Sequence, residues 1–171
     1  MKQLFCVDLK DYEENWPHSK RPSVRGIIRK DGKLAMVHSL KYGYYKFPGG
    51  GIKENESHEA TLIREVKEET GLAVVPETIK EYGYVLRLQR SEYLENTVFE
   101  QENFYYTCEV GESVGEQELD DYEAEEGFTL TFVTPEEAIR ANLSCRCEAF
   151  DKAMVERETR VLNELKASAR L

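Results

Sequence analysis

The chain has 171 residues, of which 40% are apolar and 11% aromatic, and its formal net charge is −10. The length suggests one domain, and the apolar and aromatic content argues against a disordered chain. So negative a surface argues against nucleic-acid polymers and membranes as partners, because both are bound through Lys and Arg that neutralise phosphates. A small phosphorylated ligand stays possible, because a bound divalent cation reverses the sign of the local field.

Residues 1–20 are interpreted as an N-terminal extension without a targeting signal. The apolar part of "MKQLFCVDLKDYEENW" is about four residues long, and acidic residues follow at once, unlike a signal peptide. No apolar run approaches the roughly 18 residues of a membrane span. The four cysteines form no Cys-x-x-Cys pair. We therefore expect a cytoplasmic protein with reduced cysteines.

A hairpin is predicted next, followed by a glycine loop and a helix. The β-rich segments 23–30 and 33–40 flank Asp31-Gly32, a two-residue turn signal. The run "PGGG" after Phe47 excludes regular structure. A helix is then predicted from Ser57, its N-cap, to Thr70, with Gly71 as the glycine that ends it.

The second half of the chain alternates between predicted strands and helices without a strict βαβ order. The predicted elements are strands at 72–75, 78–90, 98–110 and 128–133, an acidic loop at 111–127, a short helix at 135–142, and a C-terminal helix within 144–171. The last helix carries an apolar stripe of Phe150, Met154, Val161 and Leu165. This order predicts a mixed α/β fold, in which a mixed sheet lies between helices as an α/β/α sandwich.

The predicted central helix places three acids on one face. Glu65, Glu68 and Glu69 lie within about 100° of one another, because helical residues turn by about 100° each. Like charges at this spacing destabilise a helix by roughly 0.2–0.5 kcal/mol per pair. Arg64 offsets part of this by pairing with Glu68 four residues on. A bound hard cation would remove the remainder, and carboxylates with a backbone carbonyl and waters suit magnesium.

A solvated acidic face is the alternative, and for an arbitrary acidic run it is the commoner one. The glycine loop favours the metal site, because glycines let the backbone approach a ligand closely. In sequence, Gly50 is followed after five residues by Glu56 and after seven more by the run Arg64 to Leu72, "REVKEETGL". This spacing resembles the Nudix box, with every specified position filled.

The resemblance implies a single Nudix hydrolase domain over residues 1–171 and assigns roles to the residues of the box. Glu65, Glu68 and Glu69 would hold Mg, with Mn as the alternative ion, and the Gly49 carbonyl would be a further ligand. Glu65 or Glu68 would orient or deprotonate the attacking water, and Arg64 would position the carboxylates. The residues with a structural role would be Gly50, Glu56 and Gly71.

The implied activity is hydrolysis of a pyrophosphate bond in a nucleoside diphosphate linked to another moiety. The partner would be a small nucleotide-type substrate, and the protein a monomer or homodimer. Three alternatives stay open for the substrate: a nucleoside triphosphate, an oxidised nucleotide and an ADP-sugar. A non-catalytic Nudix module that senses a nucleotide is the alternative function.

Residues outside the box are weaker candidates. Arg25 and Arg87 could bind substrate phosphate, or could be ordinary surface cations. Phe47 could stack on a base, although packing beneath the loop is the commoner fate of such a ring. A further catalytic acid, as some family members recruit, would be one of Glu123, Glu125 and Glu126. Trp16 could cap the site or contact a second copy of the chain.

Overall fold

The computed structural model describes residues 1–147 and 151–168. An eight-stranded mixed sheet runs in the order β1-β7-β8-β3-β4-β10, while β2 pairs with β8 and β5 with β4. Its strands are β1 (Gln3–Asp8), β2 (His18–Lys20), β3 (Ser23–Lys30), β4 (Lys33–Ser39), β5 (Tyr45–Lys46), β7 (Lys80–Arg90), β8 (Val98–Cys108) and β10 (Phe128–Val133). The pairs β1–β7, β2–β8 and β3–β8 are parallel, and the other pairs of this sheet are antiparallel.

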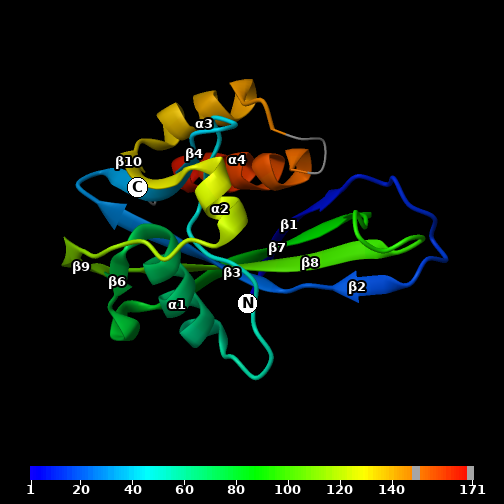
Figure 1. The fold of residues 1–171 in the computed structure, drawn as a ribbon, viewed down its shortest axis with the longest axis horizontal. Helices are drawn as coiled ribbons and strands as arrows, with labels where there is room; N and C mark the ends of the chain where they lie inside the picture. The colour runs from blue at the N-terminus through cyan, green and yellow to red at the C-terminus, as the bar shows by residue number, and fades with distance from the viewer. Residues whose placement is uncertain (148–150, 169–171) are drawn as a thin grey trace.

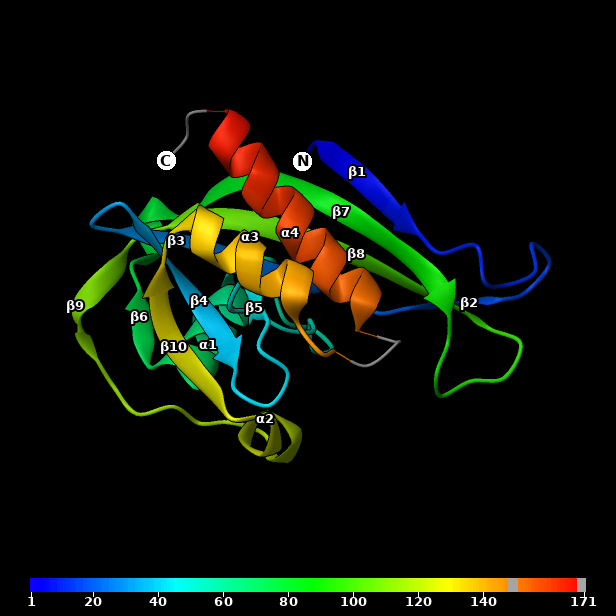
Figure 2. The same cartoon turned by 90° about the horizontal axis from the view of Figure 1, so that it is seen from above.

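Helices cover both faces of this sheet, which confirms the predicted α/β/α arrangement (Figure 1). One face carries α1 (His58–Thr70), and the opposite face carries α3 (Pro135–Ser144) and α4 (Lys152–Ala167), which lie across the strands in Figure 2. The remaining elements are β6 (Leu72–Val74), a 3₁₀ turn η1 (Pro76–Thr78), β9 (Val110–Val114), and a short helix α2 (Asp121–Glu126). The strands β6 and β9 pair as a separate small sheet.

The sheet splays between β3 and β4, and this opening receives the glycine loop. The predicted hairpin is present, but β3 and β4 pair only at Arg29↔Leu34 and Lys30↔Lys33. Nearer the start of β3, the amide of Gly26 donates to the carbonyl of Pro48 at 2.8 Å, and the amide of Val24 donates to the carbonyl of Gly50 at 3.0 Å. The loop therefore takes up donors that β4 leaves free, as buried backbone groups require.

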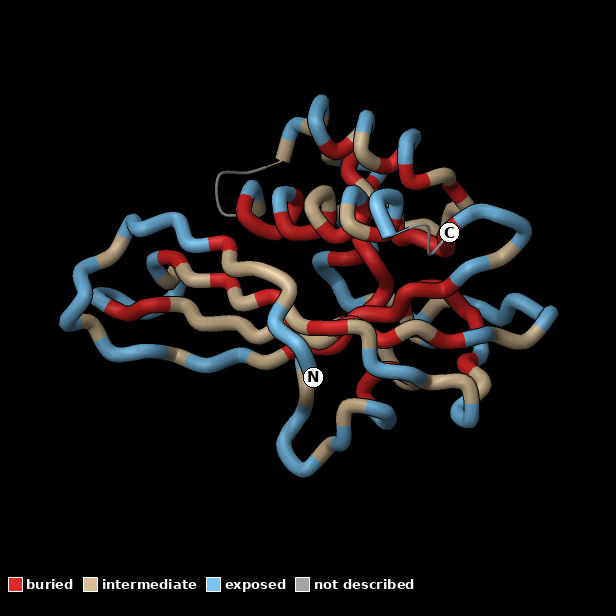
Figure 3. Tube along the Cα trace, turned by 180° about the vertical axis from the view of Figure 1, so that it is seen from behind, coloured by how far each residue is buried: buried red, intermediate tan, exposed pale blue. Residues whose placement is uncertain are grey.

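Buried residues line both sides of the central strands and the inner side of α4, red in Figure 3. Leu62 and Val66 of α1 are fully buried against one face of the sheet. On the other face, Val161 and Leu165 of α4 are fully buried, and Met154 is 8% exposed. These three match the predicted apolar stripe; Phe150, its fourth member, lies outside the described residues.

Three boundaries differ from the sequence expectations. The segment 111–127 is not one loop, because it contains most of β9 and all of α2, which has a capping box of Asp120 and Glu123. Ser144 ends α3 rather than beginning the last helix, and residues 145–147 are not helical. The N-terminal 20 residues contribute β1 and β2 to the sheet. Within the described part of the chain, no helix is long and apolar enough to cross a membrane.

Candidate metal and phosphate site

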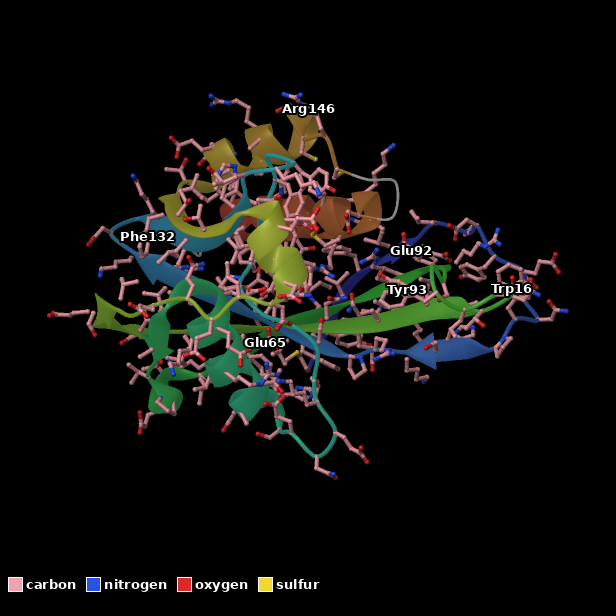
Figure 4. The ribbon with its side chains drawn as sticks, viewed as in Figure 1. Trp16, Glu65, Glu92, Tyr93, Phe132 and Arg146 are labelled. Atoms are coloured by element: carbon pink, nitrogen blue, oxygen red, sulfur yellow. The ribbon has the colours of Figure 1, made fainter. Side chains whose placement is uncertain are left out.

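Helix α1 presents the acids because its ends and one face are held in place. The Ser57 hydroxyl accepts the amide of Ala60 at 3.1 Å, and Gly71 ends the helix by donating to the carbonyl of Lys67. Both ends agree with the prediction. With its apolar stripe docked on the sheet, the helix directs its acidic face toward the glycine loop; in Figure 4, Glu65 lies between α1 and α2.

Arg64 gathers three carboxylates of the box. Its Nη1 donates to Glu65 at 2.6 Å and to Glu68 at 2.9 Å, so these two acids share one guanidinium nitrogen. Its Nε and Nη2 each donate to one oxygen of Glu56 at 2.8 Å. The hydrogen bond from Arg64 lowers the pKa of Glu56 to about 2. One planar side chain therefore sets the relative positions of the three acids.

Glu69 stands apart from the other two acids because it is buried. Its side chain is 1% exposed, its Oε1 accepts from Lys46 Nζ at 2.6 Å, and its Oε2 accepts from the amide of Gly49 at 2.8 Å. Burial raises the pKa of Glu69 to about 7, and Lys46 and Arg25 oppose that rise. The segment before α2 binds the backbone of α1 at this point. The side-chain amide of Gln117 donates to the carbonyl of Glu69, and the backbone amide of Glu118 donates to the carbonyl of Glu68.

Two glycines of the loop are required by close contacts. Gly49 has a φ of 142°, and a Cβ there would collide with the backbone of Val24 and Arg25. A Cβ at Gly50 would collide with the carboxylate of Glu65. Because Gly50 has no side chain, the Glu65 carboxylate can lie directly against the loop.

Arg25 and Arg87 lie in the protein interior rather than on its surface. Arg25 is 8% exposed and donates to the carbonyl of Gly49, while its buried Nε has no hydrogen-bond partner among the described residues. Arg87 is 4% exposed and donates to Gln89 at 2.7 Å. Burial lowers the pKa of Arg87 to about 9, and the positive charges of Arg157 and Arg25 add to that effect. Arg25 therefore lies against the glycine loop, where its charge also acts on Glu69 of α1.

Phe47 packs into the core beneath the loop. It is fully buried, and its ring meets that of Tyr105 edge-on with centroids 5.7 Å apart. Its amide donates to Glu158 of α4 at 2.7 Å. The Phe47 ring therefore packs beneath the loop, which was the alternative to stacking on a base.

The three downstream acids are all engaged in contacts. Glu123 is 5% exposed and accepts from the Asp120 amide at 3.0 Å, closing the capping box of α2. Glu126 accepts from Ser39 at 3.0 Å and Tyr44 at 2.7 Å. Glu125 makes an exposed pair with Lys41 at 2.8 Å. Glu125 is therefore a surface residue. Glu123 and Glu126 are better placed to hold α2 in position.

Trp16 lies far from the acids. Its ring lies under the guanidinium of Arg90, 5.7 Å from the ring centroid, at the far end of the β7–β8 hairpin and well away from Glu65 in Figure 4. It therefore does not cap the acidic face of α1.

The donor chemistry fits a hard divalent ion, although the carboxylates that Arg64 contacts do not converge on one point. Within the described residues, no three or more Asp, Glu, His or Cys side chains converge as a metal site. Glu65 and Glu68 are partly exposed, at 13% and 32%, and a carboxylate oxygen keeps a lone pair after its contact with Arg64. Oxygen ligands of this kind suit magnesium and manganese.

The NUDIX domain family matches residues 19–152, which include the glycine loop, α1 and most of the sheet. The chain belongs to the Nudix family. The resemblance of the box is therefore confirmed at the level of the whole domain.

Individual relatives of this Nudix protein cover less of it. An RNA pyrophosphohydrolase of Hydrogenovibrio crunogenus is 45% identical over 53 residues, and an ADP-ribose pyrophosphatase of Methanocaldococcus jannaschii is 40% identical over 53 residues. These matches cover 30% and 29% of this chain, and the chain spans about a third of each relative, 32% and 31%. A Nudix hydrolase structure from Nitrosomonas europaea shares the fold, with a TM-score of 0.54 and 20% identity over 80% of this chain and 86% of that one.

Two groups of this Nudix site were not anticipated from the sequence. Lys46 pairs with Glu69, and the available signal was a lone cation within the aromatic run "YYKF" before the glycines. Glu158 holds the Phe47 amide, and its signal was an acid in phase with the apolar stripe, four residues after Met154. An acid or cation at an otherwise apolar position is a sign of a buried pair.

Proposed function

We propose that this Nudix protein is a magnesium-dependent hydrolase that cleaves a pyrophosphate bond in a nucleoside diphosphate linked to another moiety. The observation that carries the proposal is the sharing of Arg64 Nη1 by Glu65 and Glu68, directly beside Gly50 of the loop. Acids held together in this way beside a glycine loop, with Arg25 donating to the Gly49 carbonyl, suit a metal ion that neutralises a phosphate chain.

In this proposal Glu65, Glu68 and Glu69 would hold Mg or Mn with the Gly49 carbonyl. The bound ion would neutralise phosphate charge and lower the pKa of the attacking water. Glu65 or Glu68 accepts the proton of that water, because these carboxylates are partly exposed while Glu69 is buried. Arg64 keeps both carboxylates in register, and the positive charges of Arg25 and Arg87 attract the anionic substrate.

The substrate is a small nucleotide derivative, acted on in the cytoplasm by a monomer or homodimer. The names of the two relatives refer to two different substrates, RNA and ADP-ribose. Their similarity to this chain covers less than a third of it, so it does not choose between them. Nucleoside triphosphates, oxidised nucleotides and ADP-sugars all keep the shared chemistry of a nucleoside diphosphate.

A substrate panel tests the proposal. The purified chain is incubated with nucleoside triphosphates, an oxidised nucleoside triphosphate, ADP-ribose, other nucleotide sugars and a 5′-triphosphorylated oligonucleotide, with Mg²⁺, Mn²⁺ or EDTA. We expect metal-dependent release of a phosphate-containing product from at least one compound. Tight nucleotide binding without any product would support the sensor module instead.

Matched variants link the activity to the acids. Glu65→Gln and Glu68→Gln are expected to lower kcat by about 10²–10⁴-fold, because each removes a carboxylate from the reacting centre. Glu59→Gln, on the exposed part of the first turn of α1, is the control and should keep wild-type turnover. Wild-type rates in both site variants would refute the assignment.

A further inference from the structure

Lys46 is a buried cation at the end of β5, directly before the glycine loop. Its Nζ lies 2.6 Å from Glu69 Oε1 and 4.4 Å from the centroid of the Phe128 ring. Its side chain is 9% exposed. The ammonium group is therefore enclosed between a carboxylate and an aromatic face, both of which favour a cation.

Both oxygens of Glu69 are engaged, Oε1 by Lys46 and Oε2 by the glycine loop, and the carboxylate is closed off from solvent. The second oxygen, Oε2, accepts from the Gly49 amide at 2.8 Å, and the whole side chain is 1% exposed. A divalent ion can therefore reach Glu69 only if one of these contacts gives way. It would also stand beside the ammonium, and two positive charges on one buried carboxylate repel each other.

We propose that Lys46 is a positioning residue, which pairs with Glu69 in the metal-free protein and is displaced from it when a divalent ion binds. This inference rests on the proposed function, because it takes Glu69 as one of the metal ligands. The pair keeps a buried acid neutralised and keeps Glu69 against the loop amide before the ion arrives. Metal binding then includes the cost of breaking the pair, so Lys46 weakens the affinity of the site for the ion.

Substitution of Lys46 tests this competition through metal binding rather than turnover. We measure Mn²⁺ binding by calorimetry at mildly alkaline pH, and thermal unfolding in EDTA and at saturating Mn²⁺. Lys46→Met should bind Mn²⁺ about tenfold more tightly than wild type, because the ion neutralises a carboxylate that the variant leaves unpaired. Its melting temperature should fall in EDTA and approach that of wild type with Mn²⁺.

Lys41→Met is a matched control. Lys41 also pairs with a glutamate, at 2.8 Å from Glu125, and also lies over an aromatic ring, 5.2 Å from the centroid of Tyr42. Its side chain is 43% exposed and its partner 73%. This variant should keep the Mn²⁺ affinity of wild type and its metal-free melting temperature.

The outcomes separate the inference from the proposed function. No saturable Mn²⁺ binding by wild type would refute the metal site and the inference with it. Saturable binding by wild type, with equal or weaker binding by Lys46→Met, would overturn the inference alone. If Lys46→Met does not fold, ¹⁵N NMR of the side-chain ammonium groups in wild type decides. The Lys46 resonance, identified by its loss in Lys46→Arg, should shift on Mg²⁺ saturation, and an unchanged resonance overturns the inference.

Discussion

Arg64 and Glu56 form a bidentate ion pair across the turn between the glycine loop and α1. Nε and Nη2 of the arginine each donate to one oxygen of the glutamate at 2.8 Å. The third nitrogen, Nη1, is thereby aimed at Glu65 and Glu68. The structural acid of the box thus orients the arginine that orients the proposed catalytic acids.

The first prediction concerns Arg64→Lys. An ammonium group cannot reproduce the planar fork, so Glu65 and Glu68 would lose their common donor. We expect kcat to fall about 10²-fold, as a misplacement of about 1 Å can cause. Steady-state kinetics on the substrate identified by the panel measure this. Arg140→Lys, at an exposed position of α3, should leave kcat unchanged, and a similar loss in both variants would contradict the positioning role.

The glycine loop gives a second prediction with a neighbouring control. Gly50→Ala places a methyl group against the Glu65 carboxylate and should displace it, whereas Gly51→Ala meets nothing within 4 Å. We expect Gly50→Ala to lose about 10²-fold in kcat, and Gly51→Ala to stay within about twofold. Crystal structures of both variants would show whether Glu65 has moved. Equal activity in the two variants would contradict this assignment.

The third prediction is a pH dependence of stability from Glu56. The hydrogen bond from Arg64 lowers its pKa from 4.5 to about 2. Because the folded value lies below the unfolded one, the stabilisation is complete above about pH 4.5 and is lost as the pH falls through about 2. At neutral pH, Glu56→Gln should lower the free energy of unfolding by about 1–3 kcal/mol.

Urea unfolding at several pH values measures this effect. The gap between wild type and Glu56→Gln should narrow as the pH falls from 4.5 toward 2, because wild type then loses its carboxylate. Glu54→Gln, at an exposed position of the same turn, should match wild type throughout. A gap that stays constant down to pH 2 would mean that the charge of Glu56 does not stabilise the fold.

Glu158 provides the fourth prediction. It is fully buried, pairs with Arg157 at 2.7 Å, and accepts from the Phe47 amide and the Tyr105 hydroxyl. Burial alone would raise the pKa of Glu158, but the charges of Arg157 and Arg25 lower it. Glu158→Gln removes the charge opposite a buried arginine and should cost about 3–5 kcal/mol in urea unfolding. Glu156→Gln, exposed on the same helix, should change stability by about 0.5 kcal/mol at most.

Local patterns were enough to predict α1 and most of the strands. The helix begins after Ser57 and ends before Gly71 because caps act on amides and carbonyls within one turn. The Arg64–Glu68 pair was predicted for the same reason, since residues four apart are neighbours on a helix. Helix α2 was missed because its acidic sequence resembles a solvated loop. The helix is only six residues long, so its capping box is followed by no apolar stripe that would indicate a helix.

The sequence by itself determined the spacing of the Nudix box, the face on which the acids lie, and the family, because these depend on neighbours along the chain. The tertiary structure alone decided how the three acids differ. Glu69 meets Lys46 from 23 residues away, and Phe47 meets Glu158 from 111 residues away. Burial and pairing over such separations depend on how the sheet splays and on where α4 packs, and no local pattern records either.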